Sequence, residues 1–157
     1  MEEPAMKSTE SVVSREDLKP FRLFKDIADA ALDLILEQGL RLESKKGDPI
    51  LYENRRGGIG LYLILSGLVE VLRQEPQLEA PVHVANLQAG DCFGEYSLID
   101  GSTTSAAAKA LEDCLLFFIP RGAFIQVLNG DPQIGKTFYF NLSLHLVNRL
   151  RQNDTRS

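Results

Sequence analysis

The chain has 157 residues, of which 44% are apolar and 25% are charged, and its formal net charge at pH 7 is −5. This length and composition are typical of one globular domain with its own core. The negative charge argues against nucleic acid as the main partner, because phosphate backbones are bound by clustered Lys and Arg side chains. A small anionic ligand stays compatible with it, since such a ligand needs only local positive potential.

The sequence carries no signal for a membrane or for export. It has no run of 18 apolar residues, and its first ten residues are polar and lack an apolar signal core. The two cysteines, Cys92 and Cys114, do not make a disulfide framework and are interpreted as reduced thiols in the core. The expected location is therefore cytoplasmic.

Two helices are predicted before residue 40. Ser14 and Asp17 have the spacing of a capping box, which predicts the start of a short helix that Pro20 interrupts. Asp26 is predicted to cap a second helix and Gly39 to end it. The apolar residues of this second helix recur at helical spacing: Ile27, Ala31, Leu32, Leu34, Ile35 and Leu36.

Beyond Gly39 the pattern changes to short apolar runs that alternate with turn signals. About seven strands at this spacing are typical of an all-β sandwich or barrel. The turns Ser66-Gly67 and Glu112-Asp113 are short enough to predict tight hairpins. The predicted strands are Leu40–Glu43, Pro49–Tyr52, Leu61–Leu65, Leu68–Leu72, Val82–Leu87, Ala106–Leu111 and Cys114–Ile119.

Helical spacing returns at the end of the chain. A short helix is predicted over Arg121–Leu128, and a long one begins after its cap Asp131 and runs to about Gln152. The long helix carries two apolar stripes, and the stripe that does not close the β-structure would be an exposed partner surface. The stripes are Tyr139, Leu142, Leu146 and Leu150, and beside them Phe140, Leu144 and Val147.

The stretch from Gly90 to Ala110 has the features of an anion site. Gly94 lets the backbone come close to a ligand, and the first N–H groups of a short helix over Tyr96–Leu98 would have no partner inside the helix. The hydroxyl residues 102–105 could add donors. Glu95 would repel a phosphate, so it is expected either to accept hydrogen bonds from sugar hydroxyls or to bind nearby backbone N–H groups.

This stretch resembles the phosphate-binding cassette of the cyclic nucleotide-binding domain family. The matching residues are Phe93-Gly94-Glu95, Leu98 and Ser105-Ala106. Three other segments match in the right order, and the resemblance covers about residues 18–152. These segments are the helix entry from Pro20-Phe21 to Phe24, Lys46-Gly47-Asp48, and the strands Leu61–Gly67 and Val69–Val71.

The resemblance implies a mainly β fold, an antiparallel, jelly-roll-like β-roll with N-terminal helices and a long C-terminal helix. It divides the chain into a polar tail (1–17), the β-roll with its helices (18–131), and a lid or dimerisation helix with a short tail (132–157). The implied protein is a regulatory module that binds cyclic AMP or cyclic GMP, is not an enzyme, needs no cofactor or metal, and forms a homodimer through its last helix. The implied binding residues are Phe93, Gly94, Glu95, Tyr96, Ser97, Thr104 and Ser105.

One departure from the family pattern bears directly on the ligand. Thr104 stands where the family has its phosphate-binding arginine, and the chain has no arginine between Arg73 and Arg121. A charge-assisted hydrogen bond contributes roughly 1.5–3 kcal/mol, so its loss lowers affinity on the order of ten- to a few hundred-fold. Two hypotheses follow: a sensor that binds nucleotide weakly, or a degenerate domain that binds none and acts in protein interaction or dimerisation. Tyr96 is a milder departure, because the family has an aliphatic residue there.

The remaining polar residues give weaker signals. Lys109 is expected at the surface, and Arg55-Arg56 are expected to be solvent charges. The two histidines lie far apart in the sequence, which argues against a metal cluster. In the catabolite activator subfamily that the chain resembles, a DNA-binding helix-turn-helix follows the last helix. Only five residues follow Gln152 here, so direct DNA binding is not expected. Three polar residues of the last helix could meet a base edge: Asn141, His145 and Asn148.

Overall fold

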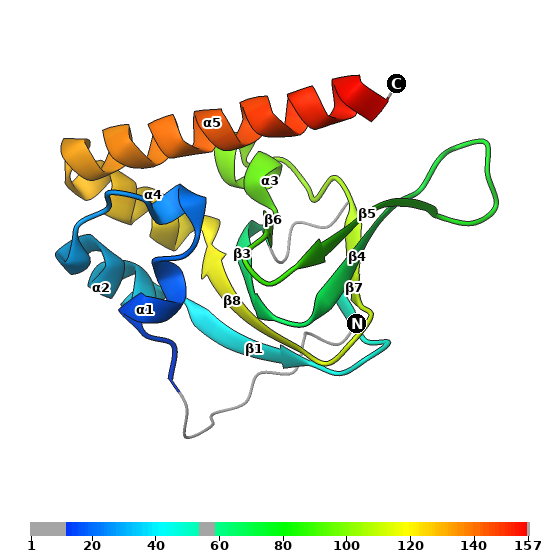
Figure 1. The fold of residues 1–157 in the computed structure, drawn as a ribbon, viewed down its shortest axis with the longest axis horizontal. Helices are drawn as coiled ribbons and strands as arrows, with labels where there is room; N and C mark the ends of the chain where they lie inside the picture. The colour runs from blue at the N-terminus through cyan, green and yellow to red at the C-terminus, as the bar shows by residue number, and fades with distance from the viewer. Residues whose placement is uncertain (1–11, 54–58, 157) are drawn as a thin grey trace.

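The computed structural model describes residues 12–53 and 59–156, with two four-stranded antiparallel sheets at its centre (Figure 1). One sheet has the order β1-β8-β3-β6 and the other β2-β7-β4-β5. The predicted β-roll is therefore confirmed, and so are the seven predicted strands to within a few residues at each end. The strands are β1 Leu40–Ser44, β2 Pro49–Leu51, β3 Gly60–Ser66, β4 Leu68–Arg73, β5 Val82–Gln88, β6 Cys92–Phe93, β7 Ala107–Ala110 and β8 Cys114–Pro120.

The two predicted tight hairpins are wrong. Ser66-Gly67 joins β3 to β4, and Glu112-Asp113 joins β7 to β8, but in both cases the joined strands belong to different sheets. The two connections lie against each other, since the Leu111 N–H donates to the Leu68 carbonyl at 2.8 Å. Short turns thus carry the chain from one sheet to the other, which a local turn signal does not distinguish from a hairpin.

Gly67 makes this close crossing possible. Its φ is +104°, and a Cβ there would lie 2.6 Å from the Cys114 Sγ and 2.7 Å from the Asp113 carbonyl oxygen.

Gly90 has a similar φ of +96° but open space around it. We expect Gly90→Ala to lower the free energy of unfolding by about 1–2 kcal/mol through backbone strain alone, and Gly67→Ala to cost roughly 1–3 kcal/mol more through overpacking. Urea denaturation measures both, and equal losses would contradict this account of the crossing.

Helices cover one side and one end of the sheets. Ser14 and Asp17 form the predicted capping box, with the Ser14 N–H donating to Asp17 Oδ2 at 2.8 Å. The second helix begins at Asp29 rather than after Asp26, because Asp26 has a left-handed φ of 63° in the turn that precedes it. The helices are α1 Arg15–Leu18, the 3₁₀ helix η1 Arg22–Phe24, α2 Asp29–Gln38, α3 Glu95–Asp100, α4 Arg121–Gly130 and α5 Pro132–Arg156.

Two apolar cores hold these layers together. Between the helices and β3 and β8, the rings of Phe24, Phe124 and Phe138 pack with centroids 4.7–6.3 Å apart. Between the sheets, Tyr62 stacks on Phe93 with a centroid distance of 4.7 Å. No helix in the described part of the chain is long and apolar enough to cross a membrane.

α5 is fixed over the end of the roll. Pro132 opens it as predicted, and the Gln133 N–H donates to Oδ1 of the cap residue Asp131 at 2.9 Å. Asn141, a candidate base-edge residue, instead donates its side-chain amide to the carbonyls of Leu23 and Lys25 at 3.0 and 2.8 Å. This anchor places the second half of α5 beside α3 (Figure 1).

Candidate functional site

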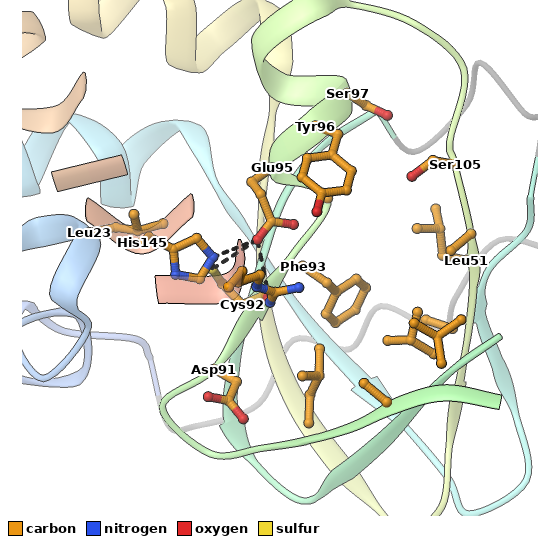
Figure 2. A pocket seen from close by; sticks show the side chains of 18 of the residues that line it. Leu23, Leu51, Asp91, Cys92, Phe93, Glu95, Tyr96, Ser97, Ser105 and His145 are labelled. Atoms are coloured by element: carbon orange, nitrogen blue, oxygen red, sulfur yellow. Dashed lines mark hydrogen bonds and ion pairs between the residues drawn. The ribbon is translucent and has the colours of Figure 1, made fainter. Parts of the chain in front are cut away.

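A cavity of about 820 Å³ lies between α3, the β4–β5–β7 face and the second half of α5. This volume is within the range of small-molecule sites. All of the residues predicted from the cassette lie on its wall: Phe93, Gly94, Glu95, Tyr96, Ser97, Thr104 and Ser105. Figure 2 shows Phe93 of β6, Glu95 and Tyr96 of α3, and Ser105 of the loop before β7 around one space. The structure thus gathers the predicted set in one place, while its role in binding stays a prediction.

Gly94 sets the start of α3 at the edge of this cavity. Its φ is +89°, and a Cβ there would lie 2.2 Å from the Gly60 carbonyl oxygen of β3. The first bond of the helix runs from the Leu98 N–H to the Gly94 carbonyl at 3.1 Å. The N–H groups of the first helical residues therefore have no partner within the helix. Only glycine allows the chain to turn this tightly against β3.

Glu95 is buried and is held by two residues of α5. Its Oε2 lies 2.7 Å from the Nε2 of His145 and 3.4 Å from Nη2 of Arg149, and the residue is 3% exposed. The other carboxylate oxygen points away from His145, toward Phe93 and Tyr96 (Figure 2). The carboxylate therefore faces α5 with one oxygen and the cavity with the other.

The sequence predicted His145 only as a residue that could meet a base edge, and it gave no role to Arg149. The two residues are four positions apart, so they lie on one face of α5. Arg149 also donates from Nη2 to the Cys92 carbonyl at 3.0 Å, which ties α5 to β6. Their spacing of four positions predicts that they share a face of the helix. It does not predict that this face contacts Glu95, which is about 50 positions earlier in the chain.

Cys92 lies beside the same carboxylate. Its Sγ is 3.8 Å from His145 Nε2 and 4.0 Å from Glu95 Oε2. Burial, and secondarily the Glu95 charge, raise the pKa of the Cys92 thiol well above its ordinary value. Both cysteines are free and buried, as predicted. Cys92, Glu95 and His145 thus form a three-residue cluster at the junction of β6, α3 and α5.

Most of the hydroxyl groups in the cassette loop already bond the protein itself. Thr104 is 3% exposed and donates to the Tyr52 carbonyl, while Ser97 donates to the Thr103 carbonyl at 3.2 Å. Ser102 donates to Asp100 Oδ1 at 2.6 Å. The exposed Ser105 lies on the cavity wall. The loop is therefore built into the fold rather than left as a row of free donors.

Other residues singled out in the sequence lie in different places. Lys109 is exposed on β7, as predicted. His83 of β5 pairs with Glu70 of β4 at 2.8 Å. Arg55-Arg56 lie outside the described residues. Asn148 lines the cavity, where it joins three cationic side chains of the wall: Arg22, Arg73 and Arg149.

Known proteins share this architecture. The family described as the cyclic nucleotide-binding domain matches residues 41–131. The cyclic AMP receptor protein of Thermus thermophilus is 34% identical over 142 residues, which are 87% of this chain and 61% of that protein. The crystal structure of the Thermus thermophilus catabolite activator protein superposes with a TM-score of 0.71 at 32% identity, covering 86% of this chain and 61% of that one. That of a cyclic nucleotide-binding domain from Methylobacillus flagellatus has a TM-score of 0.76 at 27% identity, covering 90% and 78%.

Proposed function

This chain belongs to the cyclic nucleotide-binding domain family, and we propose that it is a non-enzymatic sensor module whose cavity binds a cyclic nucleotide with reduced affinity. The observation that carries the proposal is the convergence of the cassette residues on one cavity, with a carboxylate oxygen of Glu95 facing it. The chain spans 61% of the length of the Thermus receptor, so the proposal concerns this module alone.

The proposed pose follows from the charges on the wall. The ribose hydroxyls donate to the inward-facing oxygen of Glu95, and the phosphate lies over the N–H groups at the start of α3 and near Ser105. Thr104 brings no positive charge and already donates to Tyr52. The phosphate thus has dipoles and hydroxyls where the family has a guanidinium, which supports weak binding.

Binding would also act on α5. Glu95 joins the cavity to His145 and Arg149, so a ligand on one oxygen of the carboxylate changes how strongly the other holds α5. We propose that α5 has a docked and a displaced arrangement, and a ligand with different affinity for the two shifts their populations. We assign residues 132–157 the role of this responding lid, 18–131 that of the ligand-binding roll, and 1–17 that of a polar tail.

Calorimetric titration tests the proposal directly. We expect cyclic AMP or cyclic GMP to bind the natural protein with one site per chain. The 5′-monophosphate of the same nucleoside, in which the phosphate is not cyclised, serves as the control. It should bind at least about tenfold more weakly, because its phosphate carries a second negative charge and meets no positive charge at Thr104. Absence of saturable heat with both cyclic nucleotides at millimolar concentration would reject the ligand-sensing role.

A second role is favoured by the outer face of α5. Phe140, Leu144 and Val147 follow each other at helical spacing and are 63%, 50% and 42% exposed. They lie on the side of the helix opposite the buried Phe138 and Leu142. Exposed apolar patches of this kind mark partner surfaces. We propose that this face pairs with the same face of a second copy.

The expected result for Leu144→Glu is a monomer under conditions in which the natural protein is a dimer, because the charge would be buried in the centre of the pair. Leu34→Glu is the matched control, since Leu34 is 45% exposed on α2, away from this face. Sedimentation equilibrium measures both. A natural protein that stays monomeric at 100 times the working concentration would contradict the pairing, and so would equal dissociation of the two variants.

A further inference from the structure

We propose that Cys92, Glu95 and His145 form a binding site for a zinc ion. The cluster supplies one sulfur, one oxygen and one nitrogen, and these atoms all lie within 4.8 Å of one another. A set of thiolate, carboxylate and imidazole ligands suits Zn²⁺, which accepts all three. The inference does not rest on the nucleotide proposal.

The distances are close to those of a tetrahedral site. With bonds of about 2.3 Å to sulfur and about 2.0–2.1 Å to nitrogen and oxygen, the ligand atoms around zinc lie roughly 3.3–3.6 Å apart. The corresponding separations here are 3.8 Å for sulfur to nitrogen, 4.0 Å for sulfur to oxygen and 2.7 Å for nitrogen to oxygen. Shifts of about half an ångström, with the hydrogen bond between Glu95 and His145 opening, would bring the triangle to the ideal size.

The surroundings of the cluster also suit a metal. Cys92 and Glu95 are each 3% exposed, so their ligand atoms are shielded from bulk water. A thiolate and a carboxylate would neutralise the two charges of the ion, so the site together with Arg149 would carry one net positive charge. Arg149 contacts the Glu95 carboxylate and the backbone carbonyl of Cys92, so it orients one ligand group and holds the backbone of a second.

The site would leave a coordination position free. Three protein ligands with an open fourth position is the arrangement of a zinc site that accepts water or an exogenous group. Cys92, Glu95 and His145 all line the cavity, which gives such a group access. The three ligands come from β6, α3 and α5, so zinc would join the helix to the roll. Zinc occupancy would therefore fix α5 in its docked position.

Metal titration tests the inference on the full chain without nucleotide. After treatment with a chelator, the protein is titrated with Co²⁺ as a spectroscopic substitute, and Zn²⁺ is then measured by competition. We expect one ion per chain and a near-ultraviolet thiolate-to-cobalt charge-transfer band. Zn²⁺ affinity should fall by at least about 100-fold in Cys92→Ser and in His145→Ala, since removal of even an outer partner costs 10–100-fold.

The chain offers a matched control for each ligand. Cys114→Ser changes the other buried cysteine and His83→Ala the other histidine, and both should bind zinc as the natural protein does. Zinc should also raise the melting temperature of the natural protein and of these controls, but not of His145→Ala, whose change lies on a half-buried helix face. Absence of the charge-transfer band, or equal affinity of His145→Ala and the natural protein, would show a hydrogen-bonded cluster only. Zinc binding without nucleotide binding would reject the sensor proposal and leave this inference standing. Nucleotide binding without zinc binding would reject this inference and leave the sensor proposal standing.

Discussion

Thr104→Arg is expected to bind cyclic AMP about ten- to a few hundred-fold more tightly than the natural protein. Thr104 lies on the cavity wall close to Ser105. The resemblance predicts that it stands in place of the family's phosphate-binding arginine. A guanidinium there can form paired charge-assisted bonds with the phosphate. The substitution also removes the hydrogen bond from Thr104 to the Tyr52 carbonyl, so the ligand-free variant should lose about 1 kcal/mol of stability.

Two controls separate local pairing from general charge. Thr104→Gln has a long polar side chain at the same position without the charge. Ser143→Arg adds the same charge on the exposed side of α5, away from the cavity. Calorimetry on all three variants should place the gain in Thr104→Arg alone. If a folded Thr104→Arg bound no more tightly than these controls, the loss of the arginine would not be what weakens this site.

The secondary structure shows which features the local sequence can predict. The strands, the capping box at Ser14 and the start of α5 depend on residues within a few positions of each other, and their predictions were confirmed. The hairpin predictions failed at Gly67, because whether a tight turn joins paired strands depends on where the sheets divide. The two-residue strand β6 was also missed, since it is too short to show an alternating pattern.

The residues of the candidate site also differ in whether local sequence predicts them. The cassette is continuous in sequence apart from one loop, so its residues could be named together and the structure gathers them on one cavity. The partners of Glu95 lie 50 and 54 positions further along the chain, at His145 and Arg149. Their approach depends on the anchor that Asn141 makes with η1, which fixes the path of α5. No local pattern carries that information.

Glu95→Ala is expected to weaken both cyclic nucleotide binding and the fold. The change removes the acceptor that faces the cavity, which should lower nucleotide affinity roughly ten- to a hundred-fold. It also leaves Arg149 and His145 without their carboxylate in a region where Glu95 is 3% exposed. Since both partners keep some access to water, we expect a loss of about 1–3 kcal/mol in the free energy of unfolding.

The two effects are measured separately, by urea denaturation without ligand and by calorimetry with cyclic AMP. Both experiments are run with a chelator present, so that metal binding at Glu95 does not enter. Glu70→Ala is the matched control, because Glu70 on β4 also pairs with a histidine but does not line the cavity. A Glu95→Ala protein that is less stable but binds cyclic AMP with unchanged affinity would show that the carboxylate holds α5 and does not contact the sugar. Because one oxygen faces α5 and the other the cavity, we expect both functions to be lost together.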